Sequence, residues 1–219
     1  MTAGIKSEGT KRLTHSERTS QTKAKLLEVT IELLIEKGYA HTSTNDVAKR
    51  AGLSRGAQVH HFPRKADLVV SAVEHLALKH REILLAKMEL LPEDETRTEV
   101  ALRSIWEVYR SPLWVAQMEL RNAARTDPEL KRAHARMYEN VVTPTFIDFY
   151  VALLGPGARK DQTLVDLLEM SVVFVNGLAV ARENRDDTWC DRQIKLWARM
   201  VSPVIEEVRS RCRAQAATR

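Results

Sequence analysis

Residues 41–67 read HTSTNDVAKRAGLSRGAQVHHFPRKAD, and the first part of this stretch predicts a short helix. Thr42 or Ser43 has the side-chain oxygen that an N-cap requires, and Gly52 supplies the positive φ that is favoured just past a helix end. About two helical turns separate these signals. The apolar residues fall on one face of this helix: Val47, Ala48 and Ala51.

The second part of the stretch predicts another short helix a few residues further on. Ser54 is its cap, and it extends from Arg55 to about His61 because Pro63 disfavours the helical conformation at the residue before it. Two short helices joined by a tight turn that contains glycine form a helix-turn-helix, whose second helix enters the major groove of DNA.

A wider set of residues keeps a fixed spacing around these two helices. The set is Gly38-Tyr39, Thr42-Ser43, Asp46-Val47-Ala48, Ala51-Gly52-Leu53-Ser54, Gly56, His61-Phe62, Lys65 and Leu68. It resembles the amino-terminal signature of TetR-family (tetracycline-repressor-like) transcriptional regulators, in register and without a gap. The resemblance covers roughly the first third of the chain, and beyond it only the architecture is similar.

Helical periodicity continues to the end of the chain and predicts an all-α protein. We expect a flexible basic arm at residues 1–20, a three-helix helix-turn-helix DNA-binding domain at 21–67, and a helical bundle for ligand binding and dimerisation at 68–219. A long helix from Arg64 to about Leu90 leaves the first domain and enters the second. It is the obvious mechanical link between them.

The net charge of +5 is unevenly distributed along the 219 residues. Residues 1–65 contain 12 Lys and Arg against 6 Asp and Glu, whereas the other 154 residues contain 22 against 23. A basic module on a neutral body favours a dedicated nucleic-acid-binding end over a generally basic surface.

Other sequence features argue against metal binding, export and membrane spanning. Cys190 and Cys212 have no metal-ligand spacing, and the neighbouring His60 and His61 point about 100° apart on a helix, so they do not chelate one metal together. The amino terminus has no apolar leader. We therefore expect a cytoplasmic protein with reduced thiols, no metal, no cofactor and no membrane contact.

The family motif implies which side chains contact DNA. By register with it, Thr42 and Ser43 donate to a phosphate, whereas Arg55 reaches a base edge, best a guanine. Gly56 allows close backbone approach, and Ala57 can meet a thymine methyl. The other expected contacts are Asn45, Ser54, His60, His61 and Lys65.

Two positions depart from the usual family pattern. Relatives often have Leu-Tyr where this chain has Gln58-Val59, and Val59 lacks the hydroxyl that would bind a phosphate. Gln58 is either an adenine reader, since its amide matches N6 and N7, or a cap on a solvent-facing edge. Lys65 is expected to bind phosphate irrespective of sequence.

Aromatic and methionine side chains are frequent in the central helices. For any single residue an ordinary core is the better explanation, but the set indicates a pocket for a sizeable apolar or aromatic effector. Arg121 would pair an anionic group of that effector, unless Glu119, Asp127 or a partner chain takes its charge. The full expected set is Trp106, Tyr109, Trp114, Gln117, Met118, Arg121, Phe146, Phe149, Tyr150, Met170 and Phe174.

The last two helices resemble the family's dimer face, which pairs with its copy as a four-helix bundle. Gly177 and Ala181 offer a flat strip for close helix approach; packing within one chain is the alternative. The expected interface residues are Leu167, Phe174, Gly177, Leu178, Ala181, Trp197, Val201 and Val204.

These patterns predict a homodimeric, sequence-specific transcriptional regulator, best interpreted as a repressor that a small effector releases from an inverted-repeat operator. An enzyme would need a nucleophile with its base, a phosphate loop or a metal set, and the sequence has none of these patterns. A helical adaptor that has lost DNA binding is the other alternative. Arg55, Gly56 and Lys65 argue against the adaptor because they keep a face that fits a DNA groove.

Overall fold

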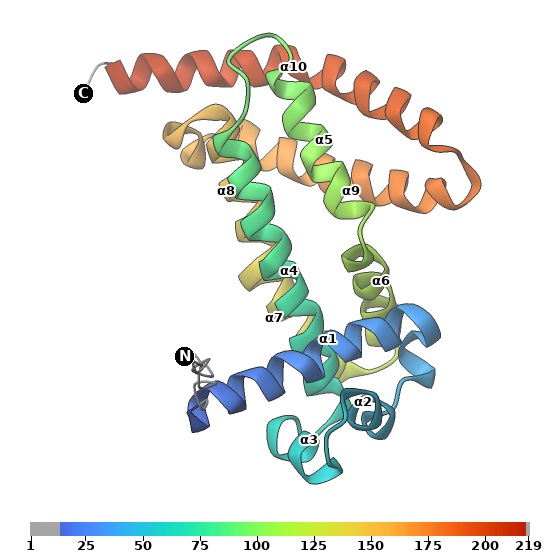
Figure 1. The fold of residues 1–219 in the computed structure, drawn as a ribbon. Coiled ribbons are helices and arrows are strands. Elements are labelled where there is room, and N and C mark those ends of the chain that lie inside the picture. Colours follow the sequence, from blue (N-terminus) through green and yellow to red (C-terminus); the bar gives the residue numbers. More distant parts are fainter. Residues whose placement is uncertain (1–13, 218–219) are drawn as a thin grey trace, which may run out of the picture.

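The computed structural model describes residues 14–217, which form helices and the loops between them (Figure 1). The helices are α1 (His15–His41), α2 (Thr44–Ala51), α3 (Arg55–His61), α4 (Lys65–Glu89), α5 (Arg97–Tyr109), α6 (Pro112–Ala124), α7 (Pro128–Met137), α8 (Thr143–Leu154), α9 (Gln162–Ala181) and α10 (Asp187–Ala217). A π-helical turn at Tyr138–Val142 joins α7 to α8, and short 3₁₀ turns follow α8 and α9. The predicted all-α fold is confirmed.

The two short helices have the caps that their sequence predicts. Ser43, not Thr42, caps α2 by accepting a hydrogen bond from the Asp46 amide, and Ser54 caps α3 in the same way. Gly52 ends α2 in the left-handed conformation, with φ 68°. The turn between the helices is therefore built as the sequence predicts.

Helix α1 begins earlier than expected. Thr14 and Glu17 form a reciprocal capping box, so residues 15–20 are helical and the predicted flexible arm is wrong for them. The rest of that arm, residues 1–13, lies outside the described part. At the other end, Gly38 leaves the helical conformation with φ 74° and ψ 171°, as expected for a helix stop.

Helix α4 links the two ends of the molecule. Figure 1 shows it running from the helix-turn-helix to the layer formed by α9 and α10. Near its start, Leu68, Val69 and Val73 are fully buried, and α1 packs along this half of α4. Farther on it contacts α5, α7 and α8 of the body. A change in its position therefore affects both parts.

The body is held together by large buried side chains. Trp106 of α5 and Phe149 and Tyr150 of α8 are each at most 1% exposed. The Tyr150 hydroxyl is hydrogen bonded to Ser171 of α9, and burial raises the pKa of Tyr150 to about 12. The π-helical turn comes just before Pro144, where a kink is expected because proline lacks the amide hydrogen of a regular helix.

Candidate DNA-binding interface and effector cavity

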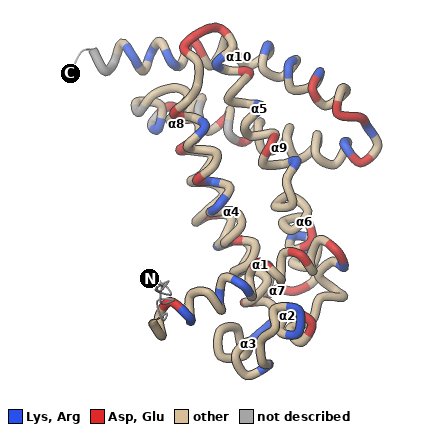
Figure 2. Tube along the Cα trace, in the orientation of Figure 1, with Lys and Arg blue, Asp and Glu red and all other residues tan. Residues whose placement is uncertain are grey.

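Helix α3 presents its first turn to solvent at one end of the molecule. Arg55 is exposed, and among residues 14–217 no ion pair or hydrogen bond holds its guanidinium. Gly56 and His60 are also exposed, and Ser43 and Asn45 are exposed at the start of α2. Basic residues gather on α2 and along the first half of α1 in the same part of the fold (Figure 2). This surface has the shape and charge that a major groove accepts.

Two ion pairs between exposed side chains join α2 to α1. Arg50 pairs with Glu36 at 2.7 Å, and Lys37 pairs with Asp46 at 3.6 Å. These four charges are engaged with one another, whereas Lys49 is exposed and has no such pair among the described residues. Lys49 is therefore a candidate phosphate contact that the family motif did not indicate. What identifies it is an exposed ammonium group on α2 that has no ion pair among the described residues.

Three of the expected DNA contacts are directed into the protein, which corrects the sequence interpretation. Thr42 is 2% exposed, and its hydroxyl donates to the Gly38 carbonyl at 2.8 Å. Gln58 is 1% exposed, and its Nε2 donates to the Phe62 carbonyl at 2.6 Å. Gln58 therefore neither reads a base nor caps a solvent-facing edge in this structure; it caps the end of α3.

Lys65 is the third correction. Its Nζ donates to the Tyr39 carbonyl at 2.5 Å and lies 4.1 Å from the centroid of the Tyr39 ring. Burial lowers the pKa of this ammonium group. The side chain thus ties the start of α4 to the end of α1 rather than extending to a phosphate. Sequence register identified the position but not the direction of the side chain.

Gln58→Ala is expected to lower stability rather than relax base preference. The change removes a buried hydrogen bond and leaves the Phe62 carbonyl without that partner, but it also removes the buried Gln58 Oε1, which has no partner among the described residues. We therefore expect a loss of about 1 kcal/mol of unfolding free energy, the lower end for an unsatisfied buried group. Urea denaturation measures the loss, and a binding-site selection with the variant should return the wild-type operator. A changed preference at one base pair would show that the amide reaches DNA after all.

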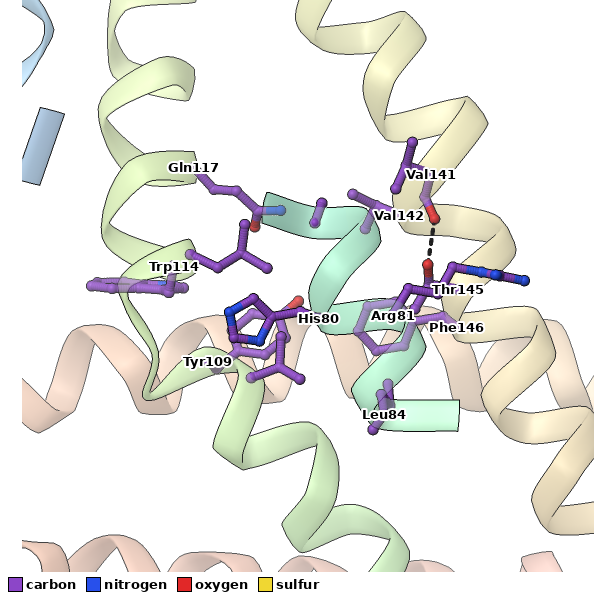
Figure 3. A pocket seen from close by; sticks show the side chains of 13 residues that line it. His80, Arg81, Leu84, Tyr109, Trp114, Gln117, Val141, Val142, Thr145 and Phe146 are labelled. Atoms are coloured by element: carbon purple, nitrogen blue, oxygen red, sulfur yellow. Dashed lines mark hydrogen bonds between the residues drawn. The ribbon is translucent and has the colours of Figure 1, made fainter. Parts of the chain in front are cut away.

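A cavity lies between α4, the α5–α6 corner and α8. Its volume is about 40 Å³. Figure 3 shows that the lining side chains of α4 lie between those of α6 on one side and those of α8 on the other. The lining is Ala77, His80, Arg81, Leu84, Val108, Tyr109, Leu113, Trp114, Gln117, Val141, Val142, Thr145 and Phe146. The cavity is therefore mostly apolar, with a few polar groups at its edge.

The polar groups of the cavity come mainly from α4 and α6. Burial lowers the pKa of His80, helped by the nearby Lys79 charge, so His80 is neutral at pH 7 and can donate or accept one hydrogen bond. The Arg81 guanidinium is held by Asp148 at 2.6 Å. Gln117 extends from α6 toward this region (Figure 3).

The expected effector residues divide into three groups. The cavity is lined by Tyr109, Trp114, Gln117 and Phe146, and their contact with an effector stays a prediction. Trp106, Phe149 and Tyr150 are buried core instead, and Met170 and Phe174 line a separate groove, so these five are corrections. Met118 and Arg121 of α6 also fall outside the lining; Arg121 is exposed and bonds the Met118 sulfur. His80 and Arg81 were missed because α4 was interpreted only as a link.

Helices α9 and α10 leave an apolar groove on their outer face. Its apolar lining residues are Leu167, Met170, Phe174, Leu196, Trp197, Met200, Val201 and Val204. Five of the expected interface residues belong to it, and Gly177 and Ala181 are at least partly accessible. Leu178 is 4% exposed within one chain, so its side chain is part of the core. Met200 of this groove, 69% exposed, was missed, and so was Val173 of α9, which is 73% exposed and lines a neighbouring pocket with residues of α8.

A helix-turn-helix joined by one long helix to a bundle with a cavity defines a class of DNA-binding regulators. Residues 26–72 match the family described as bacterial regulatory proteins, tetR family. The HTH-type transcriptional regulator CymR of Pseudomonas putida is 34% identical over 174 residues, which cover 78% of this chain and 83% of CymR. The chain belongs to the TetR family of transcriptional regulators, and members of this family are not enzymes.

Solved structures share the fold at low sequence identity. FadR from Bacillus subtilis, in complex with stearoyl-CoA, matches with a TM-score of 0.61 at 14% identity and covers 79% of this chain and 96% of its own. A TerR/AcrR-family regulator from Aquifex aeolicus VF5 matches with a TM-score of 0.58 at 22% identity, covering 82% and 99%. Among the described helices, none is long and apolar enough to cross a membrane.

Proposed function

We propose that the protein is a homodimeric repressor that binds an inverted-repeat operator and leaves it when a small effector occupies the cavity. The observation that carries this proposal is Arg55 at the first turn of a capped helix, exposed and without a partner among residues 14–217. Residues on that turn read base edges, and a guanidinium matches guanine O6 and N7. Gly56 and Ala57 would face the base edges in the major groove. The flanking phosphate contacts would be Ser43, Asn45, Ser54, His60 and His61.

The size of the cavity explains why binding an effector would change the protein's shape. Pockets for small ligands usually have volumes of about 300–1,000 Å³, whereas this cavity has about 40 Å³. An effector must therefore separate α4 from α6 or α8 to enter. Because α4 also begins at the helix-turn-helix, an occupied and an empty cavity favour different orientations of the DNA-binding end.

The lining selects an effector class. An apolar or aromatic body fits against Trp114, Phe146 and Leu84, and His80 or Gln117 can orient a polar head. An anionic group of the effector would pair with Arg81 at the cavity edge rather than with the expected Arg121. Arg81 would then be shared between the effector and Asp148. FadR binds an apolar chain with an anionic head, stearoyl-CoA, on a similar fold.

The apolar face of α9 and α10 supports the proposed homodimer. Val173 and Met200 expose most of their surface to water, which is unfavourable unless another surface covers them. Two copies of an α9–α10 pair would bury this face as a four-helix bundle. Two recognition helices would then lie about one helical turn of DNA apart, roughly 34 Å, or slightly more.

A charge on this face tests the dimer directly. Val173→Glu is expected to convert the dimer to monomer at micromolar concentration, because pairing would bury two unpaired carboxylates. Sedimentation velocity measures the mass, and operator binding should weaken in parallel. Leu90→Glu is the matched control, since Leu90 is 83% exposed at the end of α4, away from the α9–α10 groove. A dimeric Val173→Glu would place the interface elsewhere.

A further inference from the structure

The backbone of Tyr39, at the end of α1, is held from two sides, through the peptide group before its Cα and the one after it. Its N–H donates to Oε2 of Glu119 on α6 at 2.8 Å, and its carbonyl accepts from Nζ of Lys65 on α4 at 2.5 Å. The first bond therefore joins Tyr39 to the body, and the second joins it to the first turn of α4. Both are hydrogen bonds to a charged group, which are stronger than bonds between neutral partners.

Both holding residues belong to helices that line the cavity. Leu113, Trp114 and Gln117 of α6 line it, and Glu119 lies about 200° round the helix from Gln117, facing the opposite way. Ala77 and His80 of α4 line the facing wall, and Lys65 begins the same helix. Helix α6 thus separates the cavity from α1, as its packing against both α1 and α4 also indicates.

This arrangement makes the backbone of Tyr39 the point where the two cavity walls meet the DNA-binding domain. When α4 and α6 separate, Glu119 and Lys65 move apart, and the backbone of one residue cannot follow both of them. Because α1 packs along α4, the bond to Lys65 is kept and the bond to Glu119 breaks. The end of α1, which leads into α2 and α3, is then released from the body.

We propose that Glu119 and Lys65 are the positioning residues that transmit the state of the cavity to the recognition helix, by holding the Tyr39 backbone together only while the cavity is closed. This inference rests on the proposed function. The ion pair of Arg64 with Glu129 also joins the DNA-binding domain to the body. Its side chains are exposed, so it contributes little to the free energy that holds the two parts together. It provides a matched control at the same boundary.

A double-mutant cycle tests the inference without a known effector. Ala77→Phe fills the cavity with a side chain of the protein's own. Ala77→Phe and Glu119→Ala are each expected to weaken operator binding by at least about fivefold, the lower end of ordinary coupling between sites. Together they should weaken it no further than the stronger single change, because both break the same contact. Glu129→Ala should bind like the wild type.

Labelling with 15N-tyrosine gives a readout that loss of folding would not imitate. The chain has 4 tyrosines, so the Tyr39 amide is one of four resonances. Glu119→Ala and Ala77→Phe should both move the Tyr39 resonance, and in the same direction, whereas Glu119→Gln should move it less because the amide oxygen still accepts a hydrogen bond. Circular dichroism and thermal unfolding confirm that each variant is folded.

Two results would overturn the inference. Independent, multiplicative losses in the double variant would show that the cavity acts through another route, and an unmoved Tyr39 resonance in an Ala77→Phe protein that has lost operator binding would show the same. These failures differ from failure of the proposed function. In that case the wild-type protein itself would select no operator, whatever the variants did.

Discussion

Gly38→Ala is expected to lower the free energy of unfolding by about 2–3 kcal/mol, near the upper end of the range for one strained backbone position. Gly38 has φ 74° and ψ 171°, a region that is essentially restricted to glycine. A Cβ there would also lie 2.7 Å from Oε2 of Glu119, the oxygen that holds the Tyr39 amide. Operator affinity should fall with stability, because the new methyl group displaces that carboxylate. Urea denaturation and operator titration measure the two effects.

Gly52→Ala is the control for Gly38→Ala, because it measures the cost of left-handed backbone strain without a steric clash. Gly52 has φ 68° and ψ 31°, and nothing lies within 4 Å of a Cβ built there. Its replacement should cost about 1–2 kcal/mol, the usual penalty of an L-residue in the left-handed region. Two results together would contradict the role of the Glu119 contact. The free energy of unfolding would fall equally in both variants, and folded Gly38→Ala would bind the operator as tightly as the wild type.

Arg55→Ala should weaken binding to the operator by about 10- to 100-fold, the equivalent of losing one bidentate base contact. The side chain is exposed and unpaired within the described residues, so its removal leaves the free protein's stability nearly unchanged. Titration of the operator and of point variants at each base pair should show relaxed preference at one position.

Arg55→Lys is the matched control for this prediction. A lysine keeps the charge but lacks the planar fork that fits two guanine acceptors. It should therefore lose the base preference like alanine while keeping the wild-type salt slope. An Arg55→Ala protein that weakened equally on every sequence and lost about one unit of salt slope would instead make Arg55 a phosphate contact.

The sequence predicts the helix-turn-helix well because its signals are local. Ser43, Ser54 and Gly52 define caps and a turn through their own backbone preferences, and the structure confirms all three. The early start of α1 was missed because the polar residues around Thr14 resemble a tail, although Thr14 and Glu17 have the spacing of a capping box.

Side-chain direction and cavity position are less predictable because they depend on distant contacts. Gln58 and Lys65 are polar residues in a DNA-binding motif, yet both bond to carbonyls that tertiary packing brings near them. Trp106 and Tyr109 lie three residues apart on one helix, yet Tyr109 lines the cavity and Trp106 is core. Which residue lines a cavity depends on how α4, α6 and α8 cross, and no local signal in the sequence gives those crossings.

The most direct test of the account is to select random duplex DNA on the purified full-length protein and to titrate the selected sequence at several salt concentrations. The account predicts an inverted repeat with half-sites about one helical turn or slightly more apart, bound by one dimer with a steep salt slope. Failure to enrich any sequence, or binding that is equal on all duplexes, would contradict it.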